Sequence, residues 1–278
     1  MERPSPESSR LDPWTVGAIA VVSYAIANVV HEGLGHGGAC ILVGGQPQEL
    51  NAIFFECSVE GLPPAAGKWL AAGGSIANLI VAALAGIALG VLPRAGGRAR
   101  LFAWLLVAID LLMPFGYLLF SGLGNIGDWA EVIRGMEPPL AWRAVLTITG
   151  ALLYGWVAPR LLMPPLEPFL GAGPEERQAR VRTLTLLPYL VGGLTFVVAG
   201  LLNPHGVYLV LISAVAASFG GTSLLAWYPA LWARRPPVAP AAVPLGVSRS
   251  RVWLAGAAIA LVFFVGVLGP GVRFAAPR

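Results

Sequence analysis

Charged residues are scarce in this sequence, and their scarcity excludes most soluble proteins. Only 12% of the 278 residues are Asp, Glu, Lys or Arg, whereas soluble domains average roughly 25%. Long polar tracts are missing too, so the 24 prolines and 35 glycines do not indicate disorder. Both residues are tolerated in membrane helices whose neighbours satisfy the backbone. With 56% hydrophobic residues, the composition predicts a polytopic membrane protein.

A concentrated basic patch is also absent. The net charge of +4 comes from arginines in short segments between apolar runs. This pattern is typical of a membrane-topology signal and not of a nucleic-acid-binding surface. We therefore expect a lipid bilayer around the protein and no nucleic-acid partner. The sequence does not indicate the oligomeric state.

Seven apolar runs are long enough, or nearly so, to cross about 30 Å of hydrocarbon. They predict an all-α polytopic fold with six to seven transmembrane helices. The runs are Trp14–Val43, Ala66–Leu92, Leu101–Gly122, Trp142–Met163, Leu184–Leu202, Val207–Trp232 and Val252–Gly269.

The basic residues divide unevenly between the two membrane sides when the N-terminus is placed in the cytoplasm. Thirteen then lie inside and five outside, which is the bias of cytoplasmic loops toward Lys and Arg. The inner set is Arg3, Arg10, Arg94, Arg98, Arg100, Arg160, Arg177, Arg180, Arg182, Arg234, Arg235, Arg249 and Arg251, and the outer set is Lys68, Arg134, Arg143, Arg273 and Arg278. A cleaved signal peptide ending near residues 25–27 is the alternative, but the apolar run continues well past that point.

Two of the three histidines interrupt the first apolar run, in "VVHEGLGHGG" (Val29–Gly38). Hydrolytic zinc sites often use a helical His-Glu-x-x-His motif, in which both imidazoles bind one ion and the glutamate is the general base. Here His31 and His36 are five residues apart, and a regular α-helix would turn them about 140° away from each other. A π-bulge absorbs one extra residue, and the surrounding glycines accept that distortion readily. We therefore predict that both histidines bind Zn²⁺ and that Glu32 is the catalytic base.

A catalytic zinc has three protein ligands and a water. Two candidates for the third ligand lie on the same predicted membrane side as the histidines: Asp128 follows the third apolar run, and His205 lies in the turn Asn203–Gly206. Asp128 is favoured because a carboxylate balances the charge of the ion at low dielectric. His205 is the alternative, although "NPHG" is also ordinary turn sequence. Asp110 lies in the middle of a run, at a less suitable depth.

Three blocks of sequence resemble the site-2 protease family of intramembrane zinc metallopeptidases, especially its small bacterial branch. The first is the His-Glu-x-x-x-His stretch itself. The second is "AAGGSIANLIVA", which is similar to the family's Gly-x-x-x-Asn helix at Gly74 and Asn78. The third is "DLLMP" followed by "GDWAEVIRGMEPPLAW" (127–142), which is similar to the family's Asn/Pro segment and its metal-binding Asp. Glycine precedes the aspartate here, where the family usually has Asp-Gly.

The resemblance implies a role for each of five residues. His31, His36 and Asp128 would be the zinc ligands, and Glu32 would be the base. Asn78 would position the substrate chain or the catalytic water. The resemblance also implies a location in the bacterial inner (plasma) membrane.

It covers about residues 14–145 and so implies a metallopeptidase-like membrane core there. Around this core we expect a cytoplasmic N-terminal segment (1–13), further transmembrane helices (146–232), a Pro/Ala-rich linker (233–251), and a last transmembrane helix with a tail (252–278).

The segment Asn51–Val59, which follows the first run, is rich in β-forming residues. It predicts either a short strand that holds an extended substrate by edge pairing or an ordinary outer loop. Cys40 and Cys57 both fall on the predicted outer side, where a disulfide between them could form.

Together these features predict a membrane-embedded zinc metallopeptidase that hydrolyses a peptide bond of a membrane or membrane-proximal polypeptide. The alternative is a polytopic protein that binds a metal without proteolysis, or that translocates ions or protons through its intramembrane ionisable groups.

Overall fold

The computed structural model describes residues 9–91, 96–233 and 243–274. In these ranges seven helices are long and apolar enough to cross a membrane, so the predicted all-α polytopic fold is confirmed, and the protein is an integral membrane protein. The spans are Pro13–Leu42, Pro64–Val91, Gly97–Gly124, Pro139–Phe169, Pro174–Leu201, Val207–Trp232 and Arg251–Leu268.

Several of these spans combine α-helical segments with π- or 3₁₀-helical ones (η). The elements are α1 (Pro13–Val29), η2 (Val30–Gly37), α2 (Gly38–Leu42), β1 (Gln46–Leu50), β2 (Phe55–Ser58), α3 (Pro64–Val91), α4 (Gly97–Gly124), α5 (Asp128–Ile133), α6 (Pro139–Leu152), η3 (Leu153–Val157), α7 (Ala158–Leu166), η4 (Glu167–Phe169), α8 (Pro174–Val181), η5 (Arg182–Leu186), α9 (Leu187–Leu201), α10 (Val207–Leu209), η6 (Val210–Gly220), α11 (Leu224–Ala233), α12 (Arg251–Leu261), η7 (Val262–Leu268) and β3 (Val272–Arg273).

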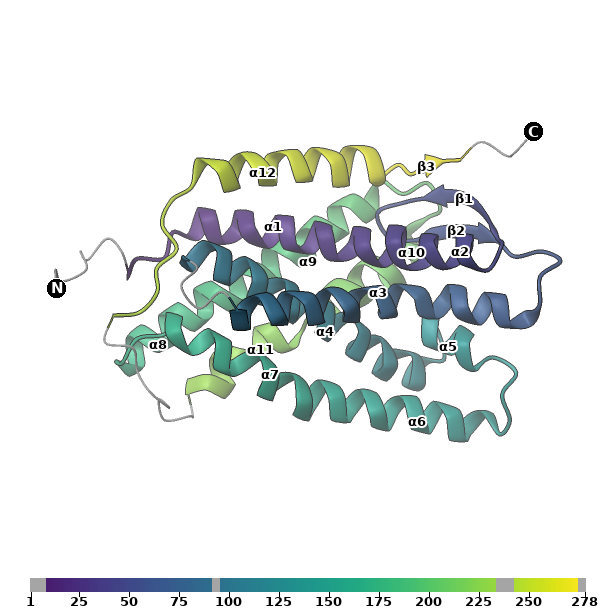
Figure 1. Cartoon of the computed structure of the whole chain (residues 1–278), viewed down its shortest axis with the longest axis horizontal. Coiled ribbons are helices and arrows are strands. Elements are labelled where there is room, and N and C mark those ends of the chain that lie inside the picture. The colour runs from purple at the N-terminus through teal and green to yellow at the C-terminus, as the bar shows by residue number, and fades with distance from the viewer. Residues whose placement is uncertain (1–8, 92–95, 234–242, 275–278) are drawn as a thin grey trace.

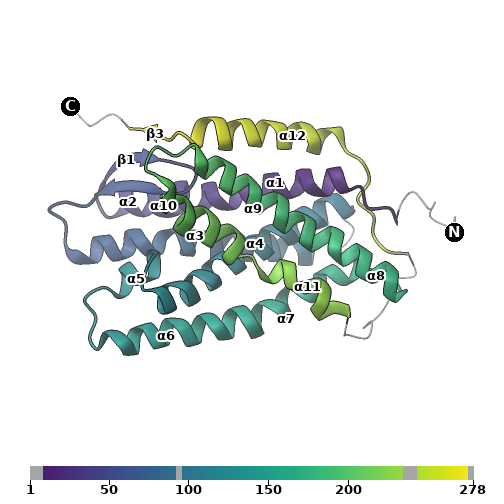
Figure 2. The same ribbon diagram turned by 180° about the vertical axis from the view of Figure 1, so that it is seen from behind.

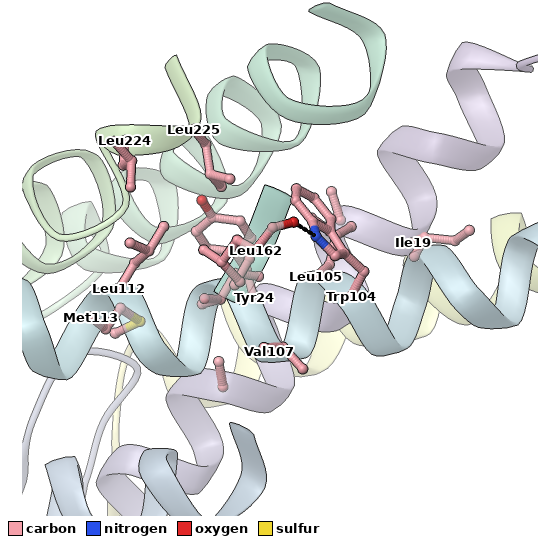
Figure 3. Packing of buried hydrophobic residues seen from close by; sticks show 14 of the residues in the cluster. Ile19, Tyr24, Trp104, Leu105, Val107, Leu112, Met113, Leu162, Leu224 and Leu225 are labelled. Carbon is pink, nitrogen blue, oxygen red and sulfur yellow. Dashed lines mark hydrogen bonds between the residues drawn. The ribbon is translucent and has the colours of Figure 1, made fainter. Parts of the chain in front are cut away.

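The spans lie side by side along one axis, and α1 runs through the interior of the bundle (Figures 1 and 2). It contacts α4, α9 and α12. Most of its apolar side chains are buried by packing, as Figure 3 shows for Ile19 and Tyr24, which lie near Trp104 and Leu105 of α4. Two polar side chains of this core are paired: Tyr24 Oη lies 2.7 Å from Thr222 Oγ1, and Trp104 Nε1 donates to Leu162 O over 2.8 Å.

The fifth span begins at Pro174 and not at Leu184 as the hydropathy predicts. Its first two turns are charged, but their arginines have partners. Arg177 forms an ion pair with Glu167 at 3.0 Å, and Arg180 donates to the Ser9 carbonyl at 2.8 Å. Because these charges are satisfied within the protein, the helix continues beyond its apolar part.

A small antiparallel sheet of order β2-β1-β3 covers one end of the bundle. The segment Asn51–Val59 combines the loop and the strand that were the sequence alternatives: its first half is a loop, and its second half contains strand β2. That this strand holds a substrate stays a prediction. Cys57 of β2 forms a disulfide with Cys40 of α2, which confirms the pairing considered from the sequence. This bond joins the sheet to the end of the first span.

The arginine-rich segments lie at the end of the bundle opposite the sheet (Figure 1). Residues 97–100, 177–182 and 249–251 are at that end, as the charge count predicts. Most of the predicted N-terminal segment 1–13 and much of the predicted linker 233–251 lie outside the described residues. The described end of the linker is fastened to the N-terminal region, because Val247 N donates to Arg10 O over 2.9 Å.

Candidate metal centre

The first span is wider than an α-helix where it carries the histidines. η2 is a π-helix of eight residues, whose i to i+5 bonds bring residues five apart onto nearly the same face. The rings of His31 and His36 consequently meet, with their centroids 4.8 Å apart and their planes at 84°. The local widening predicted from the five-residue spacing is confirmed.

Glycines let α3 approach η2 to backbone contact. A Cβ atom on Gly35 would lie 2.5 Å from Gly74 Cα, and a Cβ on Gly73 would lie 2.4 Å from Gly35 O. A Cβ on Gly74 would lie 2.5 Å from His31 Nε2 and 2.7 Å from His36 Nε2. The two ring nitrogens therefore share a space that only a glycine at position 74 leaves open.

Asp128 reaches the same space from a turn between α4 and α5. Asn125 ends α4 with φ +54° and Gly127 begins α5 with φ +82°, a conformation in which glycine is favoured. This explains why a glycine precedes the aspartate. Trp129 Nε1 donates to Ser75 Oγ over 3.1 Å and fastens α5 to α3.

The Nε2 atoms of both histidine rings face Asp128. Its Oδ2 lies 3.2 Å from His31 Nε2 and 3.5 Å from His36 Nε2. On the other side of the His36 ring, Nδ1 lies 2.7 Å from the Leu70 carbonyl oxygen. A carbonyl only accepts, so His36 Nδ1 carries a hydrogen and its Nε2 is available as a metal ligand.

The three ligand atoms could hold a metal ion. In the described residues His31, His36 and Asp128 form a group whose ligand atoms all lie within 4.8 Å of one another. A tetrahedral site with bonds of about 2.1 Å has edges of about 3.4 Å, close to the two measured nitrogen–oxygen distances. Three electron-rich atoms this close need positive charge between them, which one divalent ion or several protons would supply.

The electrostatics of Asp128 agree with this placement. Without a metal, burial raises the pKa of its carboxyl, but the positive charge of protonated His36 and hydrogen bonds with both protonated rings outweigh burial and hold that pKa well below its usual range. The carboxylate therefore stays ionised, as a ligand must.

Glu32 shares the cavity with the three ligands. Its side chain is buried, and among the described residues no donor hydrogen-bonds its carboxylate. The cavity has a volume of about 430 Å³, and its walls also include Tyr117, whose ring lies 5.6 Å from that of His31, and Phe55 and Val59 at β2. A buried carboxylate with free acceptor atoms beside a metal site can serve as a general base.

Two predicted residues have other positions. His205 does not reach the cluster, because its Nε2 lies 3.1 Å from Glu49 Oε1 at the sheet; the structure therefore gives no support to His205 as the third ligand. Asn78 is fully buried and does not line the cavity. Its Oδ1 instead lies 2.6 Å from His31 Nδ1, so Asn78 contacts a predicted ligand, and its role in positioning the substrate or the water stays a prediction.

Four residues around the site have contacts that the sequence does not predict: Gly74, Leu70, Ser75 and Asp110. Gly74 belongs to the Gly-x-x-x-Asn pattern, which does not by itself place it against the histidines, and the backbone carbonyl of Leu70 carries no sequence signal. Asp110 was weighed only as a ligand, but it accepts a hydrogen bond from Asn78. A buried acid in a membrane span is itself a signal of function, and here it is connected to the site through Asn78.

Comparison with known proteins adds no family to this geometry. No protein-family model, curated protein or solved structure matches the chain.

Proposed function

We propose that this protein is a zinc-dependent metallopeptidase of the membrane, which hydrolyses a peptide bond of a membrane or membrane-proximal polypeptide. The observation that supports it best is the convergence of His31 Nε2, His36 Nε2 and Asp128 Oδ2 in a cavity that also holds the Glu32 carboxylate. This is the arrangement that the resemblance to site-2 proteases implies for these four residues.

The ligand set favours zinc and a catalytic role. Two imidazole nitrogens with one carboxylate oxygen suit Zn²⁺. Structural zinc sites use four protein ligands, whereas catalytic sites use three and leave a position for water. The described residues supply three, and the cavity lies beside them.

When bound, zinc lowers the pKa of its water toward about 7 and polarises a carbonyl. His31, His36 and Asp128 hold the ion through the atoms named above. Glu32 takes the proton of the attacking water on a carboxylate oxygen and passes it to the leaving amine nitrogen. Burial of the site in the bundle keeps other water away from these groups.

The cavity wall suits an extended polypeptide. β2 is an edge strand of the sheet, paired only with β1 in the described residues, and Phe55 and Val59 line the cavity. An edge strand offers free backbone donors and acceptors to a further strand. We infer that the substrate segment pairs there while its scissile bond faces the metal ligands.

The orientation of the protein belongs to the same proposal. We place the arginine-rich end in the cytoplasm of a bacterium and the metal site near the outer face of its plasma membrane. Two independent features support this: the excess of arginine at the opposite end and the Cys40–Cys57 disulfide beside the site, since disulfides persist in oxidising compartments.

Metal content and hydrolysis test the proposal separately. Purified protein in nanodiscs should bind one zinc, and His31→Ala and Asp128→Ala should lose it. His205→Ala should keep it, because His205 is bound to the sheet. Two outcomes would contradict the ligand set: a wild-type protein that binds no zinc, or a His205→Ala variant that loses as much zinc as His31→Ala does.

Hydrolysis is measured on a library of single-span peptides with extended juxtamembrane segments, reconstituted with the protein. Glu32→Gln should keep zinc and lower turnover by roughly 10²–10⁴-fold, the contribution of a general base. Glu60→Gln, at an exposed position between β2 and α3, is the control and should be fully active. Zinc binding with no cleavage of any peptide would favour the non-proteolytic alternative.

A further inference from the structure

A chain of buried polar groups lies behind His31, away from the cavity. Asn78 of α3 and Asp110 of α4 are both fully buried. Asn78 Oδ1 lies 2.6 Å from His31 Nδ1, and its Nδ2 donates to the Ala27 carbonyl over 3.0 Å. The same Nδ2 group donates to Asp110 Oδ1.

This network determines which way the amide of Asn78 points. An amide can be turned by 180° with little change in shape, so its oxygen and nitrogen are assigned by their partners. The Ala27 carbonyl only accepts, and Asp110 Oδ1 accepts as well, so both partners require the NH₂ group. The amide oxygen is left facing the ring of His31.

The orientation of the amide in turn fixes the ring. Because Asn78 Oδ1 only accepts, His31 Nδ1 must donate a hydrogen to it. The Nε2 atom, which lies 3.2 Å from Asp128 Oδ2, is then the nitrogen available to a metal. Metal-binding histidines usually have such a partner on the second nitrogen, and that partner sets the ring's orientation and basicity.

We propose that Asp110 is a positioning residue of the metal centre: it holds the NH₂ group of Asn78, so that the amide oxygen faces His31 and His31 presents Nε2 to the ion. This inference rests on the proposed metal centre. Asp110 Oδ2 has no hydrogen-bond partner in the part of the chain that the structure describes. A buried acid with an unpaired oxygen lowers stability, so packing alone does not account for it.

The three histidines of the chain make a direct test practical. Protein labelled with ¹⁵N only in histidine is studied in nanodiscs without metal, and the Nδ1–H signal of each ring is measured for exchange with water. In the wild type, the Nδ1–H of His31 and of His36 should both be protected. Asp110→Leu should expose the His31 signal and leave that of His36 unchanged, because His36 donates to Leu70 O instead.

Zinc affinity, measured by competition with a chelator, gives the second readout. Asp110→Leu should weaken zinc binding by about 10–100-fold, the usual effect of an outer partner of a ligand. Asp110→Asn should stay within about threefold, because its amide oxygen can still accept from Asn78. Thr195→Val is the control: it removes another buried polar group, bonded to Val191 O at 2.8 Å, and should change neither readout.

The outcomes separate this inference from the proposed function. Zinc bound normally by Asp110→Leu with an unchanged His31 signal would overturn the positioning role and leave the metallopeptidase standing. A wild type that binds no zinc would overturn the metal centre itself. If Asp110→Leu does not fold, the His31 signal of the wild type tests the inference by itself. A His31 Nδ1 that carries no hydrogen would contradict the network.

Discussion

Gly74 and Asn78 act at the scale of single residues, and together they explain the Gly-x-x-x-Asn pattern of α3. Residues four apart lie on one face of a helix, and this face contacts the histidine helix. Gly74 leaves room for the two Nε2 atoms, and Asn78 binds the other nitrogen of His31. One face of α3 thus leaves space for the Nε2 atoms of both rings and also contacts Nδ1 of His31.

Gly74→Ala should therefore abolish zinc binding. The new methyl carbon would lie 2.5–2.7 Å from the two ring nitrogens, and the backbone fixes its position, so only a shift of the rings or of the helices would relieve the clash. The rings would be displaced and the shared space filled. Zinc content after purification from zinc-containing medium measures the effect, and the thermal unfolding midpoint reports on the fold.

Gly90→Ala is the matched control on the same helix, because a Cβ there would meet no atom within 4 Å. It should keep its zinc and gain slightly in stability, since alanine favours a helix by up to about 1 kcal/mol over glycine. Full zinc occupancy in Gly74→Ala would show that the ring nitrogens do not share this space.

At the scale of elements, the π-helix η2 accommodates one residue more than an α-helix between the same two ligands. Leu34 lies between the histidines and is 68% exposed, so it contributes little to the core. Deleting Leu34 would give the sequence His-Glu-Gly-Gly-His, whose ligands are four apart. A regular α-helix brings such residues onto one face, and the helix on either side would keep its register.

The Leu34 deletion variant should therefore retain zinc. With one residue fewer, a regular α-helical turn brings the two histidines together, as the wide π-helical turn does in the wild type. Leu34→Ala should also retain zinc and serves as the control for the lost side chain. Zinc occupancy and the cobalt absorption spectrum compare the ligand geometry of the three proteins. Loss of metal in the deletion alone would mean that the wide turn itself is required.

The elements also show what the sequence could and could not predict. The wide turn and the first two ligands follow from one helix, through the spacing of His31 and His36 and the glycines around them. Asp128 was ranked first by its position along the chain and its charge. The contacts of Gly74, Leu70 and Asn78 depend on how α3 is rotated against η2, and spacing within one helix does not determine that rotation.

At the scale of the whole molecule, the bundle has two unlike ends. The arginine-rich segments lie at one end, and the sheet lies at the other (Figure 1), where the disulfide joins it to the first span and Phe55 of β2 lines the cavity of the candidate metal centre. The same asymmetry was predictable from the order of charges along the chain, because each span reverses direction. The boundaries were less predictable, since Arg177 and Arg180 form part of a helix once their charges are paired.

Labelling of introduced cysteines should place the two ends on opposite sides of the membrane. The native cysteines are joined to each other, so one added cysteine is the only reactive thiol. Glu60→Cys near the sheet and Arg98→Cys at the start of α4 are both at exposed positions. A membrane-impermeant maleimide should label Glu60→Cys in intact spheroplasts and Arg98→Cys only after permeabilisation, because the arginine-rich end stays in the cytoplasm.

Labelling of Arg98→Cys alone in intact spheroplasts would show that the protein has the opposite orientation, with the candidate metal centre on the cytoplasmic side. Labelling of both would mean that the sheet and the arginines share one side, contrary to a seven-span bundle.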